Sequence, residues 1–507
     1  MKKNYVLAFV FSMSILVLWE VLVLKPQRQA AEKAAVPAAP TAPLTAAGTT
    51  AVSAAPRAPI SERDIVFDIG ENRLTLNHFG AAVAQWEILE QGQWVALVPA
   101  RPGAAQPLAT FPDLEFDIQR RDNAVVCRAK RADGLTVEKT FTIDPTGHLQ
   151  RVALALSNTG KSAVNADYEI GWGPGIEAQD EAAQKSRATA GTQRAIAWEP
   201  PRLLHYKKTS TQSGAYKWWA VDGHYFLAAF LNEPPTAVSL RVDKDETFYS
   251  VHRPVALVLE PKKSVTENLT FYLGPKGYED LKKLGLDLER SVDFGFFAPV
   301  GHVIHKSLLV FHRATRNYGW AIILLTLIIQ LLVLPLTISS FRHSQKMKTI
   351  QPQLKRLQEL YKSDSQRLNV EMLALYKRHG LRFMGMEGCL PVLIQLPVFW
   401  ALFSTLRSTY ELRHAPWIGW VKDLSVHDPF YVLPVLMGGG MFLQQKMSAA
   451  ALDPNQRQIM YIMPVMFTFF FLKMPAGLVI YWLTSSLISI AVQMALLRLH
   501  AQPEAAR

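Results

Sequence analysis

Two long apolar runs separated by a short basic segment constrain this chain more than any other feature. The runs cover residues 318–339 and about 388–406, and each is long enough as a helix to cross roughly 30 Å of hydrocarbon. The segment between them, residues 340–384, holds ten Lys or Arg and three Asp or Glu, a surplus of seven positive charges (10 − 3 = 7). Short basic loops stay in the cytoplasm by the positive-inside rule. The sequence therefore predicts a polytopic membrane protein whose orientation follows from this hairpin.

The N-terminus predicts a further span. Lys2 and Lys3 precede an apolar run of about 20 residues, which is longer than the 7 to 15 residues of a cleaved signal peptide. We expect an uncleaved signal anchor at 1–24 with its N-terminus inside, a cleaved signal being the alternative. Residues 25–60 are rich in Ala and Pro, a composition that cannot bury a core and predicts a disordered linker.

Residues 61–290 have the pattern of a β-domain. Short apolar runs alternate with period two, as in 135–143 and 149–156, and turn residues such as Asp133-Gly134 separate them. This predicts a large antiparallel β-sandwich, which lies outside the cytoplasm because it follows an N-in span. The aromatic run Tyr216 to Trp219 is typical of a buried core, with a sugar-binding platform as the alternative.

The rest of the chain predicts five spans, including the two apolar runs described above. Residues 291–316 are amphipathic and too polar to span, so we expect a helix lying in the outer membrane interface. The second span is 317–339, the cytoplasmic helical hairpin is 340–384, and spans three to six occupy 385–500. A short cytoplasmic tail follows at 501–507. The expected fold is therefore a six-span α-helical membrane protein with both termini inside and a large periplasmic β-sandwich.

Composition excludes several function classes. The net charge is +12 and the mean hydropathy +0.08. Because the hairpin alone accounts for a net +7 of this charge, topology explains the excess better than sequence-specific nucleic-acid binding. Cys127 and Cys389 fall in different compartments, so neither a disulfide nor a metal site is expected. The sequence contains no Walker motif and no deep Asp or Glu in the C-terminal spans. We expect no enzyme activity and no cofactor.

The hairpin predicts two antiparallel helices. Met347, Ile350, Leu354, Leu357 and Tyr361 recur at spacings of three and four, as do Leu368, Met372, Leu375 and His379. Ser363 to Gln366 has the form of a capping box. The basic residues face outward and are expected to contact anionic lipid, a nascent chain or a ribosome, unless they only fix topology. They are Lys346, Lys348, Lys355, Arg356, Lys377 and Arg378.

Polar residues inside the spans predict the functional site, because polar atoms in hydrocarbon tend to face each other or a cavity. Thr326 and Gln330 share one face of the second span, and Gln395 lies between two prolines of the third. Trp482, Ser486, Ser489 and Gln493 share a face of the last span. Two readings stay open: hydrogen bonds between helices, and a wet groove open toward the cytoplasm that lowers the barrier for polar client segments.

Three motifs carry a resemblance to a known family. Gly388 to Pro397 (GCLPVLIQLP), Met347 to Leu354 (MKTIQPQL), and Pro475 to Leu478 with Tyr481-Trp482 resemble the YidC-type membrane-protein insertases. These are related to the mitochondrial oxidase-assembly and thylakoid-assembly insertases. The similarity is dense over 294–497, and the anchor and sandwich resemble the Gram-negative form.

The resemblance implies an inner-membrane insertase and chaperone that acts alone or beside the Sec translocon. It implies nascent inner-membrane proteins as clients, delivered by ribosomes or the signal-recognition machinery, and a galactose-mutarotase-like sandwich without known catalysis. It also implies a client groove that includes Tyr481. Members usually have Arg where this chain has Gln330, and often Asn where it has Ser486. The rivals are a secondary transporter or channel, and a membrane-anchored periplasmic binding protein.

Overall fold

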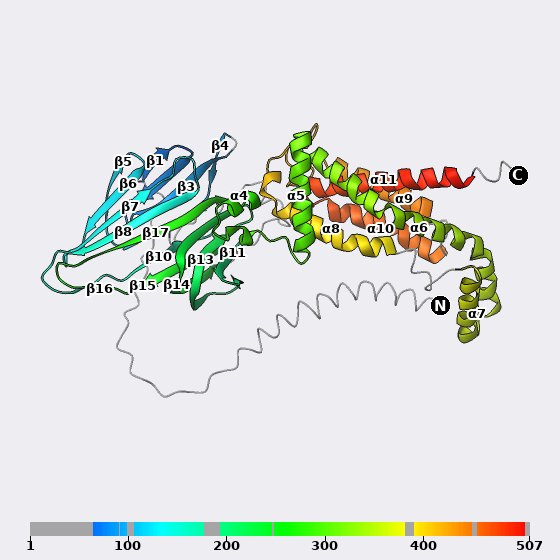
Figure 1. Ribbon diagram of the computed structural model, residues 1–507, viewed down its shortest axis with the longest axis horizontal. Helices are drawn as coiled ribbons and strands as arrows, with labels where there is room; N and C mark the ends of the chain where they lie inside the picture. The colour runs from blue at the N-terminus through cyan, green and yellow to red at the C-terminus, as the bar shows by residue number, and fades with distance from the viewer. Residues whose placement is uncertain are drawn as a thin grey trace, which may run out of the picture. The chain divides into compact units, whose positions relative to one another are not determined.

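A computed structural model describes residues 64–90, 92–98, 106–176, 193–245, 248–380, 390–448 and 454–501. The expected anchor at 1–24, the linker at 25–60 and almost all of the tail lie outside these residues. The described chain consists of a β-sheet domain followed by a set of apolar helices (Figure 1).

The β-domain contains two main antiparallel sheets. Strands β1 to β4 form one sheet in chain order, and an eleven-stranded sheet has the order β12-β11-β13-β14-β17-β8-β7-β6-β5, with β15 joining β10 to β14. Strands β9 and β16 form a separate pair. The strands are β1 (Ile65–Ile69), β2 (Asn72–Asn77), β3 (Ala82–Glu90), β4 (Gln93–Ala96), β5 (Asp117–Arg121), β6 (Ala124–Lys130), β7 (Leu135–Thr142), β8 (Leu149–Asn158), β9 (Val164–Asn165), β10 (Tyr168–Trp172), β11 (Arg194–Glu199), β12 (Arg202–Tyr206), β13 (Ser210–Asp222), β14 (Phe226–Asp245), β15 (Phe248–Val255), β16 (Val258–Leu259) and β17 (Ser264–Pro275).

The two sheets share one hydrophobic core, which makes the domain a sandwich. Trp86 on β3 packs edge-on against Phe271 on β17, with ring centroids 5.8 Å apart. The alternation expected along 135–143 and 149–156 is confirmed, since β7 and β8 alternate between buried and more exposed side chains. A strand with one buried face needs this alternation because successive side chains point to opposite faces.

The aromatic run Tyr216 to Trp219 lies in the interior, as expected for a core. The run lies on strand β13, and side chains on the two faces of this strand pack in two different hydrophobic clusters. Trp219 stacks on Phe230 in the sandwich core at 4.2 Å. Trp218, on the opposite face, is fully buried in a second cluster with Leu281 and Phe294 from the segment that leads to the helices. The sheet is therefore covered on both sides at this point.

The helical part follows the sandwich in the chain. It contains α4 (Tyr278–Lys283), the 3-10 turn η2 (Leu288–Ser291), α5 (Ala298–Thr315), α6 (Tyr318–Leu360), α7 (Ser365–Arg378), α8 (Leu390–Ser408), the turn η4 (Tyr410–Leu412), α9 (Val432–Ser448), α10 (Pro454–Phe471) and α11 (Ala476–Ala501). Of the described helices, α6 and α11 are long and apolar enough to cross a membrane by length and composition. Figure 1 shows α5 running across the direction shared by α6, α8 and α11.

Helix α6 is one continuous helix of 43 residues. It runs through the boundary near 339, where the sequence separates the second span from the hairpin, and extends about 65 Å at 1.5 Å per residue. Its start is fixed by Asn317, whose side chain accepts hydrogen bonds from the backbone N–H groups of Gly319 and Trp320. Such an N-cap satisfies donors that have no partner within the helix. The apolar span thus continues into the basic segment without a break in the helix.

Helix α7 forms the second arm of the hairpin and packs on α6. The expected capping box starts one residue too early, because the N-cap is Asp364, which accepts from the Arg367 backbone N–H at 3.0 Å. A carboxylate is a strong acceptor at this position, so it takes the role expected for Ser363. After α7, Gly380 adopts a positive φ of 66°, which suits a residue that ends a helix.

Candidate functional site

Three helices bring amide and hydroxyl side chains together inside the apolar bundle. Gln330 on α6 donates a hydrogen bond through Nε2 to Ser485 Oγ on α11. Gln395 on α8 donates through Nε2 to the same Ser485 Oγ and to the Tyr481 hydroxyl, each at 3.4 Å. We refer to Gln330, Gln395, Tyr481 and Ser485 as the polar cluster. It joins residues that are up to 155 positions apart in the chain.

The polar cluster lies well inside the apolar helices. Counting at 1.5 Å per residue, Gln330 lies about 18 Å from the start of α6, Gln395 about 20 Å from the end of α8 and Ser485 about 14 Å from the start of α11. These depths fall near the middle of a hydrocarbon layer of about 30 Å. The neighbouring surface is apolar, since Leu331, Leu332 and Leu396 are exposed.

Burial differs across the polar cluster. Tyr481 and Ser485 on α11 are buried, whereas Gln330 and Gln395 are half-buried. A Gln side chain offers two N–H donors and an acceptor oxygen. Neither amide oxygen is among the described buried side-chain atoms that lack a hydrogen bond. Beyond the Nε2 bonds to α11, each amide has an acceptor oxygen, and half-burial leaves part of each side chain accessible.

Two of the predicted groove residues have other surroundings. Thr326 is fully buried, and its hydroxyl donates to the carbonyl of Ile322 on its own helix at 2.7 Å. The Thr326 hydroxyl therefore forms its hydrogen bond within its own helix, and Thr326 is not part of the polar cluster. Trp482 is half-buried within aromatic rings, with Phe399 edge-on at 5.1 Å and Phe471 at 5.3 Å. It holds α8, α10 and α11 together by apolar contact.

The remaining predicted residues lie further along α11. Ser486 is buried, and Ser489 and Gln493 are half-buried toward the C-terminal end of the helix. Within the described residues, none of these three side chains has a recorded hydrogen bond to the polar cluster. The one member that the sequence reasoning missed is Ser485. Its signal was its spacing of four from Tyr481, which puts both side chains on one face of α11.

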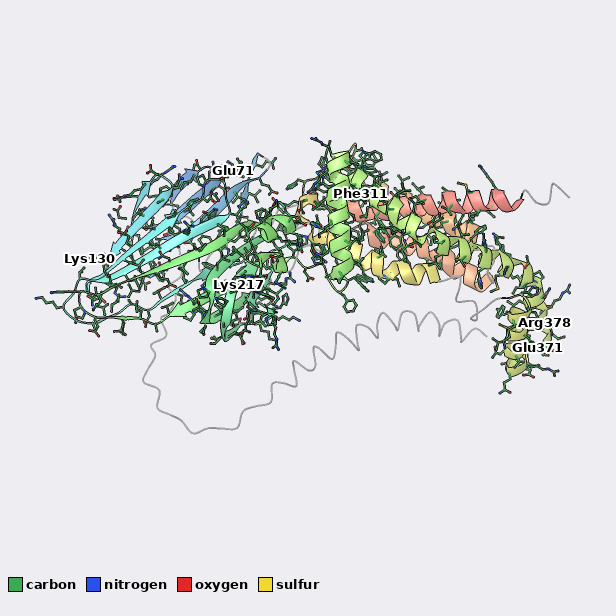
Figure 2. All side chains as sticks on the ribbon, in the orientation of Figure 1. Glu71, Lys130, Lys217, Phe311, Glu371 and Arg378 are labelled. Carbon is green, nitrogen blue, oxygen red and sulfur yellow. The ribbon has the colours of Figure 1, made fainter. Side chains whose placement is uncertain are left out.

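The basic hairpin residues lie on the two helices of the hairpin, α6 and α7, as the sequence predicts. Lys346, Lys355, Arg356, Lys377 and Arg378 are exposed, and Lys348 is half-buried. Ile350, Leu368 and Leu375 from the two apolar stripes are buried. Figure 2 shows side chains projecting from α7 around the labelled Glu371 and Arg378. The apolar stripes thus hold the arms together and leave the cations on the surface.

No set of three or more His, Cys, Asp or Glu side chains that could hold a metal ion occurs among the residues described. His302 and His305 on α5 instead contact aromatic rings. Phe294 lies 4.5 Å from the His302 ring and 5.6 Å from the His305 ring. This part of α5 therefore packs against the segment that leads out of the sandwich.

Comparisons with known proteins cover both parts of the chain. A family described as "60Kd inner membrane protein" matches residues 310–503, and a family described as "YidC periplasmic domain" matches residues 97–309. A solved structure described as an active YidC insertase with its first transmembrane domain resolved is 19% identical, with a TM-score of 0.41, and covers 85% of this chain and 92% of its own.

Two curated relatives are more similar in sequence. The membrane protein insertase YidC of Endomicrobium trichonymphae is 39% identical over 450 residues, which are 85% of this chain and 84% of the relative. The insertase of the same name from Francisella tularensis subsp. mediasiatica (strain FSC147) is 36% identical over 406 residues, 78% of this chain and 73% of the relative. On this identity and coverage, together with the two family matches, the chain belongs to the YidC family of membrane protein insertases.

Proposed function

We propose that this insertase receives the polar parts of its clients at the polar cluster. The observation that carries the proposal is the pair of half-buried amides, Gln330 and Gln395, at mid-depth in helices that are otherwise apolar. A polar group that leaves water without a new partner loses about 1–3 kcal/mol on protein scales. Amides and hydroxyls at this depth replace part of the lost hydrogen bonding.

The hydrogen bonds of the polar cluster alone are too weak to offset the desolvation of a polar client group, so water must contribute as well. A hydrogen bond between side chains in a membrane protein contributes about 0.6 kcal/mol on average, which is less than the desolvation of one polar group. We therefore propose that the free side of the cluster is hydrated from the cytoplasm. The groove then shortens the distance that a polar client segment crosses without water.

The neutral cluster also predicts which clients it suits. Members of the family usually have Arg at the position of Gln330, and a buried cation would attract acidic client tails. In the described helices α6, α8 and α11, the Lys and Arg residues lie near the helix ends or in the hairpin, at Arg342, Arg407 and Arg498 among others. We propose that the chain acts by hydrogen bonding and hydration, without covalent chemistry or a cofactor, and without a strong preference for acidic tails.

We propose the six-span arrangement for the whole protein. In it, both termini and the hairpin are cytoplasmic and the sandwich is periplasmic. The length and apolar character of α6 and α11 support it, as does the surplus of positive charge in the hairpin. The exposed hairpin cations then face anionic lipid, nascent chains or the ribosome. The Sec translocon and the signal-recognition machinery are proposed partners on the basis of family membership.

Site-specific photo-crosslinking tests the client site. A crosslinker at Gln330 or Gln395 is expected to capture a nascent single-span client. A crosslinker at Leu332, which is 75% exposed on the outer surface of the same helix, serves as the control that faces lipid. Capture at Leu332 but at neither glutamine would refute the groove.

Substitution of Gln330 tests its hydrogen-bonding role. Gln330→Leu is expected to reduce insertion of a client with a polar translocated tail by about threefold, the equivalent of one membrane hydrogen bond. Gln330→Arg is expected to retain insertion, because the guanidinium still donates hydrogen bonds. The readout is the protease-protected fraction of the client in proteoliposomes. Equal insertion by all three proteins would mean that the position serves packing only.

A further inference from the structure

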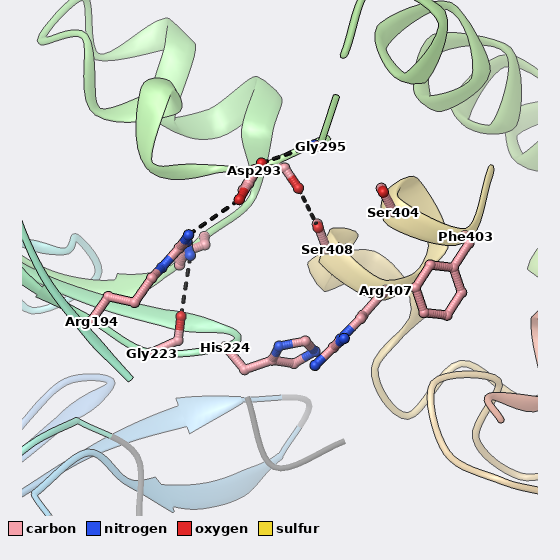
Figure 3. A pocket seen from close by; sticks show the side chains of 10 residues that line it. Arg194, Gly223, His224, Asp293, Gly295, Phe403, Ser404, Arg407 and Ser408 are labelled. Atoms are coloured by element: carbon pink, nitrogen blue, oxygen red, sulfur yellow. Dashed lines mark hydrogen bonds and ion pairs between the residues drawn. The ribbon is translucent and has the colours of Figure 1, made fainter. Parts of the chain in front are cut away.

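A polar cavity lies where the sandwich meets the end of α8. Its volume is about 250 Å³, several times the roughly 30 Å³ that one water molecule occupies in the liquid. The sandwich contributes Arg194, His224 and Lys276, the segment before α5 contributes Asp293, and α8 contributes Arg407 (Figure 3). Residues from the sandwich, the segment before α5 and α8 thus build one site.

Two of the three cations have carboxylate partners. The Arg194 guanidinium contacts Asp222 Oδ2 at 2.7 Å and Asp293 Oδ2 at 3.2 Å. The Lys276 ammonium contacts Asp222 Oδ1 at 2.5 Å and the Gly223 carbonyl at 3.2 Å. Asp222 is fully buried, so these pairs are fixed features of the wall.

Arg407 is the cation without such a partner. Its guanidinium forms no ion pair with any residue that the structure describes, and it lies beside the His224 ring in Figure 3. The site holds three cations against the two carboxylates Asp222 and Asp293, a surplus of one positive charge (3 − 2 = 1). Burial, with Lys276 and Arg407 nearby, lowers the pKa of His224 to about 3. His224 is therefore neutral at pH 7 and leaves the surplus at one.

Small groups keep the cavity open beside Arg407. Gly295 has a positive φ of 74°, and a Cβ atom there would lie 2.7 Å from Ser404 Oγ. The Ser408 hydroxyl donates its hydrogen bond to the Asp293 backbone carbonyl at 2.7 Å. Its proton is therefore not available to a ligand. Ser404 lines the cavity and has no recorded hydrogen bond within the described chain. One hydroxyl and one guanidinium thus remain to bind a ligand.

We propose that this cavity binds a single phosphate group carrying one negative charge, as found in the phosphodiester of an anionic phospholipid. A guanidinium recognises phosphate oxygens through two parallel hydrogen bonds, and Ser404 supplies a third donor. A surplus of one charge matches a monoanion better than a dianion. An acyl chain is favoured beside it, because Phe403 lines the cavity and Trp400 is exposed one turn earlier on α8.

The location of the phosphate at the outer membrane surface rests on the six-span arrangement proposed above. There α8 ends at Ser408 with Arg407 at the interface. A lipid headgroup in the cavity would contact the end of a span and the sandwich together. Occupancy would then couple the position of the sandwich to the lipid composition of the outer leaflet.

Native mass spectrometry of the purified full chain tests this site. The protein is titrated with phosphatidylglycerol and, separately, with zwitterionic phosphatidylcholine. We expect one phosphatidylglycerol to bind in preference, and Arg407→Gln to weaken that binding about tenfold or more, the loss of a charge-assisted contact. Arg407→Lys retains the charge without the paired donors and is expected to bind with intermediate affinity. Lys422→Gln, an exposed cation of the loop after α8, is the matched control and should bind as the unmodified protein does.

Inorganic phosphate distinguishes the source of the anion. One informative outcome is that millimolar phosphate raises the Tm of the unmodified protein and leaves that of Arg407→Gln unchanged. If the unmodified protein also binds phosphatidylglycerol no better than phosphatidylcholine, the site binds phosphate from a soluble ligand. Equal lipid binding by Arg407→Gln and Lys422→Gln, or no dependence on either anion, would overturn the proposal. Client insertion is measured on the same proteins. Gln330→Leu is included in both assays. If this variant inserts clients poorly but binds phosphatidylglycerol as the unmodified protein does, the defect concerns the client site alone.

Discussion

A buried ion pair links the sandwich to the segment after α8, and its removal should destabilise the protein strongly. Glu90, at the end of β3, accepts a hydrogen bond from the Tyr410 hydroxyl at 2.5 Å and pairs with the Arg413 guanidinium. Only 9% of the Glu90 side chain and 10% of the Arg413 side chain are exposed. The Arg413 guanidinium also lies 5.0 Å from the centroid of the Phe226 ring. Glu90→Ala therefore leaves a largely buried cation without this carboxylate.

The structure supplies an internal comparison for the magnitude. Breaking a buried pair by removing one partner costs about 3 kcal/mol or more, whereas an exposed pair contributes about 0–1 kcal/mol. The Arg128–Glu138 pair in the same domain has a comparable contact at 2.7 Å, but its side chains are 50% and 40% exposed. For a folding unit of about 200 residues, 3 kcal/mol corresponds to a Tm shift of roughly 6–12 °C.

Thermal unfolding of the full chain in detergent, followed by tryptophan fluorescence, measures both variants. We expect Glu90→Ala to lower the Tm by about 6–12 °C and Glu138→Ala by less than about 4 °C. Glu90→Gln keeps a neutral acceptor and should lie between them. If Glu90→Ala and Glu138→Ala shifted the Tm equally, burial would not govern the strength of these pairs.

Two further predictions concern pH. The His414 ring donates a hydrogen bond through Nδ1 to the Asp423 carboxylate at 3.2 Å, which raises the pKa of His414 above 6.5. The stability from this pair is therefore complete below pH 6.5 and falls as pH rises through the raised pKa. His414→Gln should abolish that fall in Tm between pH 5.5 and 8.5, and an unchanged slope would contradict it. Burial lowers the pKa of Lys139 to about 7 from 10.5, so the unfolded chain binds the extra proton between these values and stability should rise with pH. Lys139→Met should flatten this rise between pH 7 and 9.5; a rise that persists in the variant would assign it to another group.

Local features of the fold follow from the sequence because their causes are local. The alternation in β7 and β8 is predictable, since a half-buried strand needs an apolar residue at every second position. The same holds for α6 and α7, whose buried residues Ile350, Leu368 and Leu375 recur with helical spacing. The capping error at Ser363 shows the limit of this reasoning. Two neighbouring residues can each cap a helix, and the backbone geometry of the turn selects Asp364.

For the candidate site, too, the sequence predicts some features and leaves others to the tertiary structure. Depth in the bundle is a property of position along a helix, so Gln330 and Gln395 could be selected from sequence as polar residues within apolar runs. Whether such a residue meets another helix depends on its surroundings. Thr326 shares a helix face with Gln330 yet donates to its own backbone. Trp482 contacts aromatic rings, while its neighbour Tyr481 reaches Gln395.

The sequence by itself determined the class of protein. Its apolar runs, the basic segment between them and the alternating strands specify a sandwich joined to membrane helices, because each depends on residues near one another in the chain. Tertiary structure alone decided which distant side chains meet. Ser485 joins Gln330 and Gln395 from 155 and 90 positions away, and Arg407 completes a cavity with Arg194 and Lys276. Such contacts depend on how helices and strands pack in three dimensions, which no periodicity along the chain encodes.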